Sequence, residues 1–237
     1  MLDDILCMNK KIAKQSIELI TKNWFMVFLG LAYATINMVA YMFISIIAIG
    51  PLAIVGGFLL AILSAALMSH YLYMLNQVIK TGKINKYDVK DGFMAYIWKI
   101  YGIYFIYWIA NLLLSRIQLG IVVPLILLLV LNVLPEVIYL KYYDAVGTIT
   151  YSLEFIRENW IEWYIPNSLI LLIIFFYTGN VFSAGFNILI NFSISKVLIF
   201  VLSQFLFNYF MIYRGLLFEL LSTSTRRKRA FMRSCQK

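Results

Sequence analysis

The sequence predicts an all-α integral membrane protein with six transmembrane helices arranged as three hairpins. Two observations predict this class. Of the 237 residues, 63% are hydrophobic and 13% are charged, whereas a soluble domain carries roughly 25% charged residues. In addition, long stretches contain no Asp, Glu, Lys or Arg, and a helix needs about 20 apolar residues to cross the hydrocarbon core of a bilayer.

The first hairpin has the clearest signal. No charged residue occurs from Asn23 to Ile79, and Gly50-Pro51 near the middle of this stretch predicts a turn. We therefore expect spans at about 24–49 and 52–79. The same criteria place the other four spans at about 97–115, 119–135, 164–182 and 197–213.

The distribution of basic residues predicts the orientation. With the N-terminus inside, all of the 20 Lys and Arg residues except Arg116 and Lys196 fall on the inner side, and inner loops retain Lys and Arg. The abundance of Ile, Lys, Asn and Tyr is typical of AT-rich bacterial genomes. We therefore expect a multi-pass protein of the bacterial plasma membrane with both termini in the cytoplasm.

The chain divides into one membrane domain, residues 1–222, and a basic cytoplasmic tail, residues 223–237. Clustered cations near a membrane bind anionic lipid at about 1 kcal/mol per residue. We therefore expect the tail to face the anionic inner leaflet, and we expect no nucleic acid partner, because no binding motif accompanies the charges. The four consecutive basic residues of the tail are Arg226, Arg227, Lys228 and Arg229.

Two segments ahead of the first and fifth spans resemble each other. Residues 16–24 read SIELITKNW, and residues 152–160 read SLEFIRENW. Each belongs to an amphipathic stretch, at about 3–22 and 144–160, that is expected to lie in the membrane interface. The apolar rows expected to face lipid are Ala13, Ile17, Ile20 and Trp24 in the first copy and Ile149, Leu153, Ile156 and Trp160 in the second.

Trp24 and Trp160 are expected to anchor these helices at the level of the headgroups, where an aromatic ring with one polar edge is stable. A third segment, residues 88–98, precedes the third span. It shares the design of an amphipathic lead followed by an apolar helix, but few of the residues. The internal similarity predicts a repeated unit.

Amphipathic leads that end in Asn-Trp and open a hairpin resemble a group of bacterial membrane proteins. The group includes the membrane domain found fused to glycerophosphodiester phosphodiesterases. The resemblance rests on residues 13–24 and 149–160 and on the six-span layout. It implies a helical membrane fold and no catalytic residue, because the hydrolase chemistry of that family belongs to a separate soluble domain. Glu162 and Pro166-Asn167 depart from the pattern.

Two ionisable residues are candidate functional groups. Glu136, beside Pro135, would mark an ion or substrate path if it lay within the membrane. The favoured interpretation places it at headgroup depth, paired with Lys141 or water. His70 allows a proton relay, but a neutral histidine that is hydrogen-bonded to a neighbouring helix is favoured, because the chain has no second histidine.

Small residues recur at every fourth position of the second span. Such a row lets the backbone of another helix come close, so we expect helix packing there, within this chain or with a second copy. The row consists of Ala53, Gly57, Ala61, Ala65 and Ser69.

The sequence contains no Walker A loop, no His-Glu-x-x-His and no Gly-x-Ser-x-Gly. With two cysteines and one histidine, we expect no catalytic site, no metal site and no cofactor. The favoured function is a non-catalytic membrane module in an envelope or lipid-linked process, or a scaffold for partners. The alternative is a permease subunit of an ABC-type exporter that works with a separate ATPase, with 80–94 or 141–160 as the coupling segment.

Overall fold

A computed structural model of the chain describes residues 2–47, 50, 52–85, 88–114, 129, 131–178 and 194–224. These residues form helices and connecting turns, with no strand among them. Four of the described helices are long and apolar enough to cross a membrane, and they correspond to Met26–Ile46, Ile54–Thr81, Val89–Ala110 and Phe200–Thr223. The expected all-α fold with membrane-spanning helices is therefore confirmed at this level.

Four of the predicted spans coincide with helices. These are α2 (Met26–Ile47), α3 (Leu52–Thr81), α5 (Ile97–Leu114) and α10 (Ile194–Thr223). The span expected at 164–182 begins within α8 (Ala145–Thr178) and continues past the described residues, and the span expected at 119–135 lies mostly outside them. The number of six spans stays a prediction.

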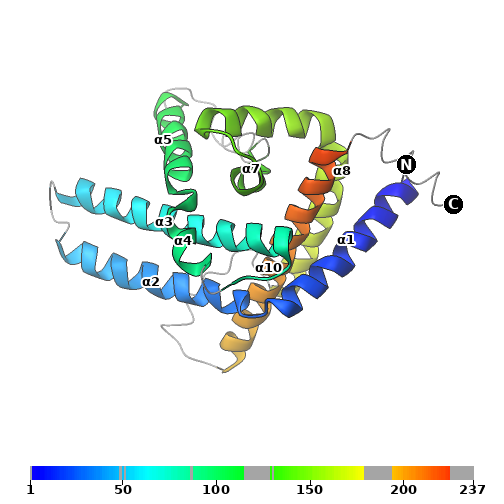
Figure 1. The fold of residues 1–237 in the computed structure, drawn as a ribbon. Helices are drawn as coiled ribbons and strands as arrows, with labels where there is room; N and C mark the ends of the chain where they lie inside the picture. Colours follow the sequence, from blue (N-terminus) through cyan, green and yellow to red (C-terminus); the bar gives the residue numbers. More distant parts are fainter. Residues whose placement is uncertain are drawn as a thin grey trace.

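The turn between the first two spans lies where the sequence places it. Gly50 has a φ of 63°, a left-handed conformation that glycine adopts without the steric cost of a Cβ atom. Helices α2 and α3 contact each other and run side by side in opposite directions (Figure 1). These two helices thus form an antiparallel pair, and the arrangement of the spans in three hairpins stays a prediction.

Helix α10 packs against helices from both halves of the chain (Figure 1). It contacts α1 (Leu2–Lys22), α2, α3, α7 (Leu134–Leu140) and α8. Every residue of α10 from Met211 to Phe218 is buried. The core of the protein therefore surrounds the second half of its last described helix.

The two similar segments adopt the same backbone arrangement. Helix α1 ends in a turn at residues 23–25, after which α2 begins, and α8 is interrupted at Asn159, where φ is −123° and ψ is 20°. Asn23 and Asn159 therefore both mark the change from an amphipathic helix to an apolar one. We call residues 2–22 and 145–158 the first and second lead helices.

Matching residues of the lead helices also have matching environments. Ser16 and Ser152 are fully buried, and each hydroxyl donates a hydrogen bond to the carbonyl oxygen four residues earlier, at 2.8 and 2.7 Å. The side-chain amides of Asn23 and Asn159 do the same, at 2.9 and 3.2 Å. Both lead helices pack against α10. The sequence similarity therefore corresponds to a structural repeat.

One expectation about the lead helices is wrong. The apolar row of the first copy was expected to face lipid, and Ile17 and Trp24 are indeed exposed. Ile20, however, is fully buried, and the neighbouring Leu19 is buried as well. The apolar residues of this helix cover a wide face. The part with Leu19 and Ile20 is buried against protein, because α10 presents an apolar surface there, and the part with Ile17 and Trp24 is exposed. Trp24 and Trp160 are 64% and 58% exposed, and their role as interfacial anchors stays a prediction.

The third segment has the same plan in a shorter form. Helix α4 (Asp88–Ala95) ends at a break at Tyr96, and α5 begins at Ile97. The break is held by Ser69 of α3, whose hydroxyl donates to the carbonyl oxygen of Gly92 at 2.9 Å and accepts from the Tyr96 amide at 2.8 Å. A lead helix, a break and an apolar helix thus occur three times in the described residues.

Part of the row of small residues on α3 packs against another helix. Ala65 and Ser69 are fully buried, and α4 packs against this end of α3. Ala61 is half-buried, and the side chain of Ala53 lies outside the described residues. Gly57 is exposed and has no described neighbour within 4 Å of a Cβ position, so packing with a second copy stays a prediction for this residue.

A methyl group added at Gly215 should destabilise the fold, because it would overlap Ile79 of α3 and the hydroxyl of Tyr139 of α7. We expect Gly215→Ala to lower the free energy of unfolding by about 1–3 kcal/mol, the usual cost of overpacking a core. Thermal unfolding in detergent micelles measures the change. Gly57→Ala is the matched control and should have little effect, and equal effects of the two variants would contradict the packing of α10 described here.

Candidate functional site

The candidate site is built on a buried ion pair between α7 and α10. Glu136 lies in the first turn of α7, where a carboxylate interacts favourably with the helix dipole. The Arg214 Nε and Nη2 atoms donate to the two carboxylate oxygens of Glu136 at 2.7 and 2.8 Å. The side chains are 0% exposed for Glu136 and 7% for Arg214. A two-point contact of this kind fixes the orientation of both groups.

Residues of neighbouring elements make further contacts with the Arg214 guanidinium. Arg214 also donates to the backbone carbonyl of Asn132, in the turn before α7. Its guanidinium carbon lies 5.1 Å from the ring centre of Trp163 and 5.4 Å from that of Phe210, within the range of cation–π attraction. The Trp163 indole in turn donates to the Asn132 side-chain oxygen at 3.1 Å. The ion pair therefore joins α7, α8 and α10.

The expected partner of Glu136 is wrong. Lys141 does not pair with Glu136; its ammonium lies 5.5 and 5.9 Å from the ring centres of Tyr151 and Phe218. Glu136 is also fully buried among protein side chains, which differs from the expected exposure to headgroups and water. The reason is that α10 does not end near residue 213, as expected, but continues to Thr223 and carries Arg214 into the core.

Other groups hold α7 in position. The Lys99 ammonium, from α5, donates to the carbonyl oxygens of Ile138 and Lys141, each at 3.0 Å. A cation at the C-terminal end of a helix is favourable because the last carbonyl groups point toward it. The hydroxyl of Tyr139 is buried with no hydrogen-bond partner in the described residues. Burial raises the pKa of Tyr139 well above its usual value, and the Glu136 carboxylate raises it further.

A cavity of about 450 Å³ adjoins the ion pair. Its lining includes Pro135 of α7 and Arg214 of α10, and the remaining lining residues come from α2, α3 and α10. Most of the lining is apolar, and the polar groups are few. The apolar lining includes Leu67, Met68, Leu72, Phe207, Phe210 and Met211, and the polar lining includes Tyr33, Asn37, Ser64 and Gln204.

His70 lies one hydrogen bond away from this cavity. The ring nitrogen Nδ1 is hydrogen-bonded to the hydroxyl of Tyr33 on α2, and the ring stacks on Phe93 at 4.2 Å between centroids. The expected hydrogen bond to a neighbouring helix is therefore confirmed. No described contact joins His70 to Glu136, so the two candidate residues belong to separate parts of the structure.

The amide of Asn208 also connects helices, as side-chain amides within membrane-spanning helices commonly do. Its nitrogen donates to the backbone carbonyl of Met26 at 3.4 Å, and its oxygen accepts from the Tyr71 hydroxyl at 3.0 Å.

The basic residues Arg226, Arg227, Lys228 and Arg229 lie outside the described residues.

The residues missed by sequence reasoning are Arg214 and Trp163. Arg214 was assigned to an inner loop on charge alone. The available signal was the apolar sequence Gly215 to Phe218 that follows it, which continues the helix past the charge. No group of three His, Cys, Asp or Glu side chains that could hold a metal ion occurs in the described part of the chain.

Comparison with known proteins finds no matching family model, no matching curated protein and no matching solved structure. The resemblance to the membrane domain of glycerophosphodiester phosphodiesterases therefore stays a prediction.

Removing one charge of the ion pair should destabilise the fold more, per substitution, than removing both charges together. Glu136→Leu or Arg214→Met leaves one buried charge without its partner, and each variant should lose about 3–5 kcal/mol of the free energy of unfolding. The double variant should lose clearly less than the sum, because no charge is left buried. Denaturant unfolding in mixed micelles measures all three variants.

Lys141→Ala is the control, because it tests the partner that the sequence suggested. It should cost about 0.5–1 kcal/mol, the size of a cation–π contact at a partly exposed site. Strictly additive losses for Glu136→Leu and Arg214→Met would show that the two charges do not interact, and the site would then be misdescribed.

Proposed function

We propose that the chain is a non-catalytic protein of the bacterial plasma membrane that binds a lipid-like amphiphile between α2, α3 and α10. The proposal includes six spans in three hairpins, with both termini in the cytoplasm. The position of the basic residues supports this orientation, because only Arg116 and Lys196 of the 20 Lys and Arg fall on the outer side.

The observation that carries the proposal is the cavity of about 450 Å³. Ligand sites are typically concave and mostly apolar, with a few placed polar groups, and this cavity has that composition. Its walls belong to helices that are each able to cross a membrane, where the surrounding medium is acyl chains. An acyl chain along Leu67, Met68 and Phe207 is therefore the occupant whose chemistry fits the walls.

The polar lining indicates the kind of headgroup. The Arg214 Nε atom lies 2.7 Å from a carboxylate oxygen of Glu136. The pair is neutral overall, so Arg214 presents a dipole to the cavity rather than a free positive charge. The phenol of Tyr33 and the amides of Asn37 and Gln204 offer hydrogen-bond donors and acceptors. These groups suit an uncharged or zwitterionic headgroup that is recognised by hydrogen bonds.

Filling the cavity should remove the bound amphiphile. Ser64→Trp places a large side chain among the polar groups. If it prevents two hydrogen bonds between the headgroup and the lining, at about 1 kcal/mol each, the retained lipid should decrease roughly tenfold or more. Mass spectrometry of lipids that remain bound to the detergent-purified protein measures the decrease.

Ile62→Trp is the matched control, because Ile62 lies on the same helix, is exposed and does not line the cavity. It should retain the lipid of the unaltered protein. If both Trp variants retain equal amounts of lipid, or if the unaltered protein retains none above the level of free detergent micelles, the proposal is wrong.

One observation favours the alternative of an exporter permease. Helix α4 lies in the segment 80–94 and exposes Val89 and Met94 beside the exposed Lys90, a surface that a helix-binding groove of an ATPase would fit. A permease should retain an ATPase during purification, and Lys90→Glu should weaken that association. Lys86, the second cation of this segment, lies outside the described residues.

A further inference from the structure

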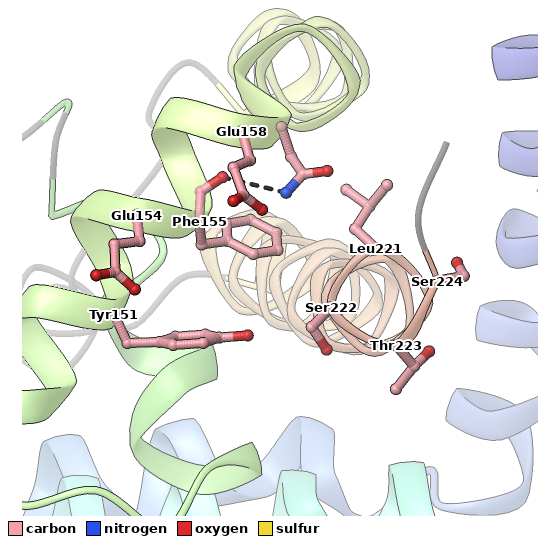
Figure 2. Close-up of a pocket in the computed structure, with 9 residues that line it drawn as sticks. Tyr151, Glu154, Phe155, Glu158, Leu221, Ser222, Thr223 and Ser224 are labelled. Carbon is pink, nitrogen blue, oxygen red and sulfur yellow. Dashed lines mark hydrogen bonds between the residues drawn. The ribbon is translucent and has the colours of Figure 1, made fainter. Parts of the chain in front are cut away.

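A second cavity, of about 470 Å³, lies between the second lead helix and the end of α10 (Figure 2). Residues from α8 form one side, and the last turn of α10 with Ser224 forms the other. We call it the tail groove. Its lining consists of Tyr151, Glu154, Phe155, Glu158, Asn159, Leu221, Ser222, Thr223 and Ser224.

The tail groove is acidic. Glu154 and Glu158 are exposed carboxylates on its α8 side, and no Lys or Arg occurs among its lining residues. Burial raises the pKa of Tyr151, and the neighbouring Tyr143, Glu158 and Glu154 raise it further. Burial is the largest cause of this rise, and the two carboxylates contribute because a negative charge nearby disfavours the ionised phenol.

The structural repeat shows that the second carboxylate, that of Glu158, belongs to one copy only. Glu18 and Glu154 occupy equivalent positions of the two lead helices, but Lys22 of the first copy is replaced by Glu158 in the second. Gln15 is likewise replaced by Tyr151. Since both lead helices pack on α10, the substitutions give α10 an acidic neighbour on the α8 side.

The chain itself supplies a complementary segment at this point. Ser224 lines the groove, and the residues that follow, 225–237, contain no Asp or Glu. Because an extended residue spans about 3.3–3.6 Å, the first arginine after Ser224 starts within about 7 Å of the groove. The cations of this segment are Arg226, Arg227, Lys228, Arg229, Arg233 and Lys237.

We propose that the tail groove is the binding site of the chain's own basic tail, with Glu154 and Glu158 pairing with the Arg226–Arg229 cluster. The inference does not depend on the amphiphile proposed above. The two carboxylates and the apolar floor of Phe155 and Leu221 would hold the cluster against the second lead helix. Since anionic headgroups attract the same cations, the tail has two competing sites, and a membrane rich in anionic lipid withdraws it from the groove.

Distance measurements between spin labels test the proposal on the full chain. Cys7 and Cys235 are replaced by Ser, and labels are placed at Leu153→Cys, which is exposed on α8 outside the groove lining, and at Ala230→Cys in the tail. In nanodiscs of neutral phosphatidylcholine, the expected distance distribution is narrow. Replacing part of the phosphatidylcholine with anionic phosphatidylglycerol should broaden the distance distribution.

Charge reversal identifies the partners. Glu154→Lys with Glu158→Lys should broaden the distribution in neutral lipid, and Glu18→Lys, at the equivalent position of the first copy, should leave it narrow. Changing Arg226, Arg227, Lys228 and Arg229 to Glu in the reversed-groove variant should restore the narrow distribution, because the charges are then exchanged. Both groove glutamates are exposed, so these variants are expected to fold, and thermal unfolding verifies this.

Two results would overturn the proposal. A broad distribution for the unaltered tail in neutral lipid means that the groove does not hold it. A distribution that narrows only with anionic lipid, and that is unchanged by Glu154→Lys with Glu158→Lys, assigns the tail to the membrane surface alone.

Discussion

The arrangement of the helices depends on the buried pair of Glu136 and Arg214. Apolar helices in a membrane gain little from burying one apolar face rather than another, because lipid tails are as apolar as the side chains they replace. A charge has no such freedom. Arg214 is satisfied only where the carboxylate of Glu136 and the carbonyl of Asn132 meet it, and this requirement sets the rotation and the depth of α10. A buried pair of this kind contributes more to the choice of one arrangement than to net stability.

Once α10 is fixed, the repeat determines how the rest of the chain surrounds it. In both lead helices a buried serine and a terminal asparagine bond to their own helix, so these four side chains need no partner from α10. The first lead helix has one further polar contact, because Asn9 accepts a hydrogen bond from the Tyr213 hydroxyl of α10 at 2.9 Å. Because the serines and asparagines need no such partner, two copies can contact the same helix although only five residues are identical between SIELITKNW and SLEFIRENW, and positions such as Lys22 and Glu158 were free to diverge.

Local features were predictable from the sequence, and pairings between distant segments were not. Hydropathy located α2, α3 and α5 and the turn at Gly50, because each depends on neighbouring residues alone. The similarity of the two Asn-Trp segments predicted a repeat before the common break at Asn23 and Asn159 was known. Neither signal identifies which helix a buried charge will meet. The sequence marks Glu136 as unusual and suggests Lys141 as its partner because Lys141 is close in sequence, whereas Arg214 is reached only through the tertiary fold. The buried state of Ile20 was missed for the same reason, since an apolar stripe does not distinguish lipid from protein.

The two cavities are located at different levels of one helix. Gln204, Phe207 and Arg214 line the first, and Leu221 to Ser224 line the second, with residues 215–220 of α10 between them. A close-packed interior transmits displacement instead of absorbing it, and α10 is a continuous helix from Ile194 to Thr223. A force on the end of α10 therefore reaches the wall of the first cavity unless Arg214 holds the helix in place. Because the guanidinium is bound to the Glu136 carboxylate at two points, the ion pair resists rotation of α10 about its axis. The two-point contact between Glu136 and Arg214 therefore opposes rotation of α10 at a position between its two ends.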